Sequence, residues 1–174
     1  MDIALVSSYV VHVTSAALWT GATLYFVYSW YIIPHLRDDS PPDAVSFVAS
    51  ADALLRVTRW TGIALPVTGA YLILRLYSLD ALVGTARGSL VLVMAATWGS
   101  MNGIMETGVF RMRRLTGEIG VKEYMLEGFP PSYFSADRAE SEALRDTGSR
   151  YMLVAAVLAV VLLIDAAVLS SGAV

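Results

Sequence analysis

Long apolar stretches separated by short charged segments dominate this sequence. Four stretches contain no Asp, Glu, Lys or Arg: residues 3–36, 60–74, 88–105 and 151–164. A helix needs about 20 mostly apolar residues to cross the hydrocarbon core of a bilayer. The second stretch reaches that length if Arg75 extends its charge toward the interface, and the fourth does if Asp165 lies inside the span. The pattern therefore predicts four transmembrane helices, over residues 3–34, 56–77, 88–113 and 149–172.

These spans predict an all-α fold, because a helix pairs every backbone polar group within its own segment and so suits lipid. We expect one membrane domain over residues 1–174, built as a four-helix bundle in contact with the lipid bilayer. Pro34 is expected to end the first helix. Ser40, Pro41 and Asp43 indicate the start of a short interfacial helix that leads into the second span. Residues 114–148 form the predicted cytoplasmic loop.

Composition and charge agree with a membrane protein and exclude several other classes. Of the 174 residues, 56% are hydrophobic and 16% are charged, and the mean hydropathy is +0.61. A net charge of −3 gives no reason to expect nucleic acid as a partner. The chain has no cysteine, which excludes disulfides and thiolate metal sites. Ten of the 12 Lys and Arg residues fall at one face of the predicted bundle. The positive-inside rule then places both termini outside the cytoplasm, in a multi-pass protein of the cell membrane.

His12 and Asp165 are the chief ionisable residues that the predicted spans place deep within the membrane. Such residues indicate functional sites by default. His12 shares a helix face with Trp19, and depth counting puts Asp165, Thr68 and Trp98 near its level. One interpretation is that His12 pairs with Asp165. The alternative is that His12 is a neutral side chain hydrogen-bonded to a neighbouring helix and that Asp165 is hydrated at the outer interface. His35 lies too far along the helix to share a metal ion with His12.

The third predicted span carries two further patterns. Met94, Met101 and Met105 lie along one line of the helix; thioether sulfur suits Cu(I), although a methionine stripe is also typical of ordinary packing. Gly99 and Gly103 form a GxxxG motif, which predicts a close helix contact, either within the bundle or between protomers. Asn102 lies one turn from Glu106, for which we expect solvation or pairing with an arginine. In the second span, Thr68 is a candidate partner for a backbone group freed by Pro66.

The first predicted helix resembles the opening helix of CopD-like membrane proteins. It has a histidine, His12, followed by Trp19 at +7 and Gly21 at +9, and the related HemJ-type protoporphyrinogen oxidases share this pattern. The segment from Arg59 to Thr68 and Gly69 looks like the next helix of the same family. This resemblance covers about 75 residues and implies that His12 contacts copper or haem. HemJ-like members often carry a lysine in the third helix, and residues 88–105 have none, which disfavours an enzyme.

Three functions therefore stand open. The leading one is a CopD-like protein that handles a copper ion or b-type haem through His12. In it, Asp165, Thr68, Trp19, Trp98 and Asn102 are supporting polar residues, and the three methionines are soft ligands. The second is a non-catalytic accessory subunit of a respiratory or transport complex, or a homo-oligomer, assembled through Gly99 and Gly103. The third is a HemJ-like oxidoreductase.

Overall fold

The computed structural model describes residues 2–37, 43–115, 120–126 and 138–172. These residues are almost entirely helical, and no β-strand occurs among them. The long helices are α1 (Ile3–Val27), α3 (Ala44–Leu76), α5 (Ala86–Leu115) and α7 (Arg138–Ser171). The short elements are a π-helical turn η1 (Tyr28–Ile32), α2 (Ile33–Arg37), α4 (Leu79–Gly84) and α6 (Val121–Leu126).

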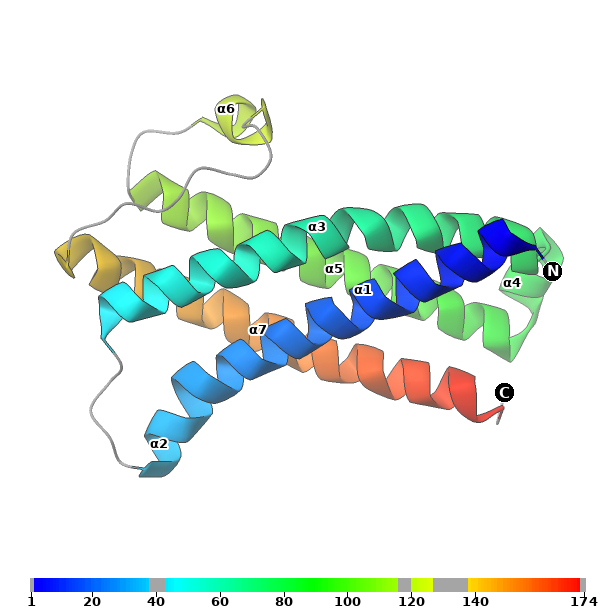
Figure 1. Ribbon diagram of the computed structural model, residues 1–174, viewed down its shortest axis with the longest axis horizontal. Helices are drawn as coiled ribbons and strands as arrows, with labels where there is room; N and C mark the ends of the chain where they lie inside the picture. The colour runs from blue at the N-terminus through cyan, green and yellow to red at the C-terminus, as the bar shows by residue number, and fades with distance from the viewer. Residues whose placement is uncertain (1, 38–42, 116–119, 127–137, 173–174) are drawn as a thin grey trace.

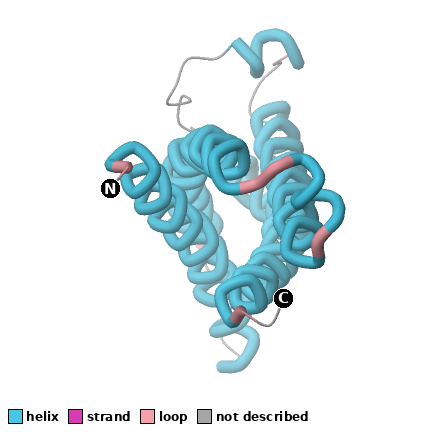
Figure 2. The backbone as a smooth tube through the Cα atoms, turned by 90° about the vertical axis from the view of Figure 1, so that its right-hand side faces the viewer, coloured by secondary structure: helices cyan, strands magenta, loops and turns pink. Residues whose placement is uncertain are grey.

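The long helices lie lengthwise beside one another in two closely associated pairs. α1 contacts α3 along its length, and α5 contacts α7 in the same way. Contacts of α7 with α1 and α3 join the two pairs. Figure 1 shows both chain ends at the same end of the helices, and Figure 2 views the molecule from that end. Such an arrangement requires the chain to cross the length of the molecule an even number of times.

Three of the described helical segments are long and apolar enough to cross a membrane. They are Ile3–Ile32, Ala86–Leu115 and Ala143–Ser171. α3, which contains the predicted second span, does not reach that apolarity, because Arg59, Pro66 and several threonines and glycines dilute its aliphatic residues. The protein is therefore a helical chain with three potential transmembrane helices.

The end of the first predicted helix and the start of the second differ from the prediction. Helical structure continues through Pro34 to Arg37, and the π-helical turn ends at Ile32, two residues before that proline. A π-turn changes the backbone pairing locally, so that a residue without an amide proton is accommodated. The interfacial helix and the second span are one continuous helix, α3, which Asp43 caps by accepting from the Ser46 amide at 3.0 Å. Ser40 and Pro41 lie outside the described residues.

The connections also contain helical structure that the sequence pattern did not predict. Ser78 caps α4 by accepting from the Ala81 amide, and Thr85 accepts from the Gly88 amide at the start of α5. A Cβ at Gly88 would lie 2.4 Å from the Ala81 carbonyl oxygen, so the tight α4–α5 turn needs glycine. The predicted loop over 114–148 is shorter than expected, because α7 already begins at Arg138 and α6 lies within the loop.

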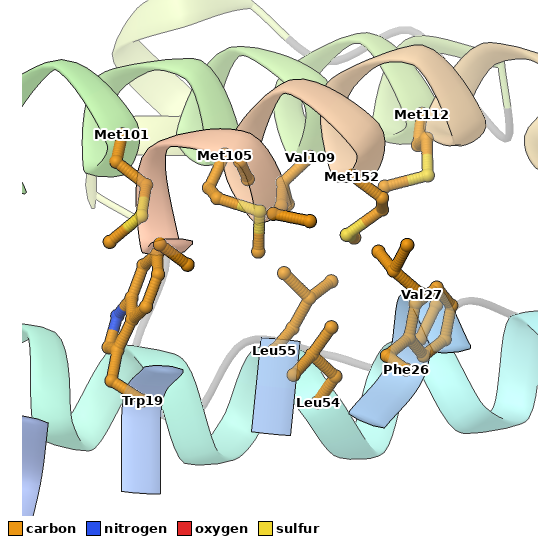
Figure 3. Close-up of a cluster of buried hydrophobic side chains, with 14 of the residues drawn as sticks. Trp19, Phe26, Val27, Leu54, Leu55, Met101, Met105, Val109, Met112 and Met152 are labelled. Atoms are coloured by element: carbon orange, nitrogen blue, oxygen red, sulfur yellow. The ribbon is translucent and has the colours of Figure 1, made fainter. Parts of the chain in front are cut away.

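The core is an apolar cluster shared by all the long helices. Figure 3 shows Trp19, Phe26 and Val27 of α1 facing methionines of α5 and Met152 of α7, with Leu54 and Leu55 of α3 between them. Close to it, the buried Phe47 ring lies 5.3 Å from Phe26 and 5.6 Å from Trp30 by ring centroids. Close packing of these large side chains holds the long helices together.

Candidate functional site

His12 is held against α3 by a hydrogen bond to Thr68. The distance from His12 Nδ1 to Thr68 Oγ1 is 2.9 Å, and the same hydroxyl lies 2.6 Å from the carbonyl oxygen of Ala64. A hydroxyl has one proton to donate. Because that proton goes to the carbonyl of Ala64, the Thr68 oxygen accepts from Nδ1–H of His12. This assigns the proton to Nδ1 and leaves Nε2 as the ring nitrogen for a ligand.

Gly69 gives the imidazole its place on α3. A Cβ at Gly69 would lie 3.0 Å from His12 Cε1 and 3.5 Å from His12 Nδ1. The ring therefore rests on the backbone of the helix, where a larger residue would push it away. Hydrogen bonding by Thr68 and the absence of a side chain at Gly69 together fix both the rotation and the position of the His12 ring. Sequence reasoning placed Thr68 near the level of His12 and made it a candidate partner for a backbone group freed by Pro66, whereas it donates to the Ala64 carbonyl.

A second polar contact lies two turns further along α1. Trp19 is 1% exposed, and a Cβ at Gly62 of α3 would lie 3.6 Å from its Nε1. The same position lies 3.3 Å from Oδ1 of Asn102, on α5. Sequence reasoning named Trp19 and Asn102 separately and missed Gly62. The glycine spacing in the sequence could have indicated Gly62. It lies seven residues before Gly69, so both glycines lie on the same face of α3.

An ion pair lies next along this face of α3. Arg59 Nη2 donates to Glu106 Oε2 of α5 at 3.1 Å, and the two side chains are 13% and 37% exposed. This confirms the expected pairing of Glu106 with an arginine. Together with the two contacts above, the pair forms a row of polar groups between α3 and its neighbours. We call it the polar row: Arg59, Glu106, Gly62, Trp19, Asn102, Thr68, Gly69 and His12.

Asp165 and Trp98 each bury a polar atom with no hydrogen-bond partner among the described residues, Oδ2 and Nε1 respectively. The close contacts of Gly108 with Tyr151 and of Gly148 with Met112 fix the antiparallel register of α5 and α7. Extended at the regular helical rise, this register puts Asp165 level with residues 94–95 of α5. The contact of Gly62 with Asn102 puts Thr68 within one turn of that level. Asp165 and Thr68 therefore lie at a similar depth. Of the two, it is Thr68 that forms the hydrogen bond with His12.

The methionines of α5 lie mainly in the apolar core. Met101 is 0% and Met105 is 4% exposed, and both belong to the cluster that contains Trp19. Figure 3 shows Met101 and Trp19 pointing toward each other. Since Trp19 follows His12 by seven residues, it lies about 10 Å further along the helix axis. Met101 and Met105 therefore do not share an ion with His12, whereas Met94, two turns before Met101, lies near the level of His12.

Gly99 and Gly103 make no close contact within the described structure. A Cβ at either position would meet nothing within 4 Å. The close approach of α5 and α7 occurs at other glycines: a Cβ at Gly108 would lie 2.8 Å from the Tyr151 ring, and one at Gly148 would lie 2.8 Å from the Met112 sulfur. Among the described residues there is thus no close helix contact at the GxxxG motif, which lies on the exposed side of α5. A contact between protomers stays a prediction.

Comparison with known proteins adds no identification. No protein-family model matches the chain, and no curated protein or solved structure matches it either. The described residues also contain no cluster of three or more His, Cys, Asp or Glu side chains arranged to hold a metal ion. The resemblance to CopD-like proteins therefore stays a prediction, and the geometry around His12 carries the functional argument.

Proposed function

We propose that this chain is a four-span protein of the cell membrane, with both termini outside, in which His12 is a ligand for b-type haem or a copper ion. The single observation that carries the proposal is the fixed orientation of His12. Histidines that bind metals commonly donate their other ring N–H to a neighbouring acceptor, which sets the tautomer and the ring orientation. Thr68 is such an acceptor, and it leaves Nε2 for a ligand.

The position of α3 supports a fourth span. α1 meets the apolarity and length of a transmembrane helix, and α3 contacts it from end to end. Asp2, just before α1, pairs with Arg75 of α3 at 2.6 Å, and His12 contacts Thr68. If α1 crosses the bilayer, residues 59–75 of α3 occupy the same depth. The polar residues of this segment that face α1 and α5 are then shielded from lipid.

The residues around His12 fit haem and copper to different extents. A haem iron takes one or two axial ligands from protein, so one His12, or His12 from each of two copies, is enough. When bound, haem supplies one-electron chemistry. A copper ion needs further donors. Met94 and Asp165 lie near the level of His12, whereas Met101 and Met105 lie in the core. A copper ion would be cargo or an effector held by His12 with these neighbours.

Optical spectroscopy and metal analysis of the protein purified in mild detergent test the proposal. Bound haem is recognised by a Soret band in the optical spectrum. Bound copper is recognised by a stoichiometric copper content in a protein that lacks this band. We expect His12→Ala to abolish either signal. Thr68→Val should weaken binding by about 10–100-fold, the usual effect of removing a partner that orients a ligand. Thr107→Val is the matched control, because the Thr107 hydroxyl bonds to the carbonyl of Gly103 in its own helix and Thr107 lies far from His12. Signals that survive His12→Ala would refute the proposal.

A second candidate function, an accessory subunit of a membrane complex, is favoured by Gly99 and Gly103. Both glycines lie on a side of α5 where an added Cβ meets nothing within 4 Å, which leaves room for a helix of another chain. Gly99→Leu should then dissociate a native complex, measured as particle size in detergent, while the isolated chain keeps its helical content. An unchanged particle size would argue against this function.

A further inference from the structure

The middle of the polar row contains a buried donor that the protein itself does not satisfy. Trp19 is 1% exposed, and its Nε1–H has no hydrogen-bond partner among the described residues. Buried N–H groups in native proteins almost always have a partner, either protein or ordered water. Indole nitrogen is a donor only, so the missing partner must be an acceptor. The surroundings of this nitrogen therefore indicate what binds there.

An acceptor on a third helix approaches the same point. Asn102 Oδ1 of α5 lies 3.3 Å, and Trp19 Nε1 of α1 lies 3.6 Å, from the position that a Cβ would take at Gly62. The two atoms do not bond to each other directly, because Trp19 Nε1 has no such partner. Glycine at position 62 of α3 thus leaves open the space between a donor and an acceptor. A carboxamide and an indole so placed suit a molecule that both accepts and donates.

We propose that Trp19, Gly62 and Asn102 form a binding site for one water molecule, which accepts from Trp19 Nε1–H and donates to Asn102 Oδ1. Water has the required size and both functions, and buried waters typically bridge polar groups that would otherwise be unsatisfied. The site lies between the Arg59–Glu106 ion pair and the His12–Thr68 hydrogen bond. It therefore extends the polar row through the apolar core, and it does not depend on whether His12 binds a metal.

Gly62→Ala is the sharpest test of this site. The added methyl group would lie at ordinary distance from Trp19 and slightly close to Asn102, so it displaces the water without a severe clash. Gly21→Ala is the matched control, because it adds the same methyl group to α1 where nothing lies within 4 Å. The protein is labelled with 15N in its four indole groups and studied by NMR in lipid nanodiscs. Trp19→Phe identifies the Trp19 signal.

We expect the Trp19 indole proton to show a cross-relaxation peak to water in the original protein and in Gly21→Ala. In Gly62→Ala the peak should disappear, and the indole proton should move toward the frequency of a free N–H. The absence of the water peak in the original protein would overturn the proposal, as would its persistence in Gly62→Ala. If Gly62→Ala does not fold, Asn102→Ala takes its place, since it removes the acceptor and adds no atoms. An unchanged water peak and indole frequency in that variant would equally overturn the proposal.

Discussion

Gly108→Ala tests whether α5 and α7 are held at the distance that glycine permits. The new Cβ would lie 2.8 Å from Tyr151 Cγ and 2.9 Å from Tyr151 Cβ, both of which are atoms close to the α7 backbone. These atoms cannot move aside by rotating the end of a flexible side chain. The helices must separate, or the tyrosine must leave its rotamer and its position beneath the Arg111 guanidinium, which lies 5.7 Å from the ring centroid.

The magnitude follows from comparing this variant with Gly103→Ala. Both changes replace a helical glycine with alanine and so share the same gain in helix propensity, about 1 kcal/mol. Only Gly108→Ala creates a clash, because Gly103 has open space around it. Overpacking a well-packed contact typically costs about 1–3 kcal/mol. We therefore expect the free energy of unfolding of Gly108→Ala to be about 1–3 kcal/mol lower than that of Gly103→Ala.

The assay is equilibrium unfolding in mixed micelles as the fraction of denaturing detergent increases, followed by circular dichroism. Gly148→Ala adds an intermediate point, because its Cβ would meet the flexible Met112 sulfur at 2.8 Å and should cost less than Gly108→Ala. Equal stability of Gly108→Ala and Gly103→Ala would refute the inferred α5–α7 contact. A loss of stability in Gly103→Ala would show that the GxxxG motif faces another helix.

Two further predictions concern charged contacts. The Leu5 amide, and then Arg75, lower the pKa of Asp2 below its ordinary value of 3.8. A carboxylate with a lowered pKa contributes stability above its unfolded pKa and loses it as pH falls through the folded pKa. The original protein should therefore lose more stability than Asp2→Asn on acidification from pH 5 to pH 2, measured by thermal unfolding; parallel losses would contradict this. For Arg59 and Glu106, a double-mutant cycle with Arg59→Gln and Glu106→Gln should give a coupling energy of about 0.5–1 kcal/mol, with zero coupling as the contrary result.

The helical class of the protein could be predicted from the sequence because charge is costly in lipid and must be confined to short segments. The predicted spans that contain His12, Met94 and Asp165 indeed coincide largely with helices long and apolar enough to cross a membrane. The same reasoning is weaker for the predicted second span. Its Arg59 and Arg75 pair with carboxylates outside the helix, and its threonines donate to carbonyls of the helix itself. A composition pattern along one segment contains no information about such contacts.

Contacts between helices account for the remaining differences. Glycine spacing is visible in a sequence, but it does not show whether a glycine faces a partner, as Gly108 does, or open space, as Gly103 does. Nor does depth counting give the rotation of each helix about its axis. It put Thr68 near the level of His12, but it offered Asp165 as the candidate partner at that level. Helix packing turned Thr68 toward the imidazole and left Asp165 without that bond.

The sequence by itself thus determined which long segments are helical and which few polar residues lie in an apolar environment, since both follow from the cost of exposing charge and backbone to lipid. Only the tertiary structure decided that His12 rests on Gly69, that Trp19 and Asn102 meet beside Gly62, and that Arg59 pairs with Glu106. Each of these contacts joins residues at least 40 positions apart along the chain or on different helices. Their formation depends on the register and rotation of whole helices, which are set by how the buried side chains of the core fit together.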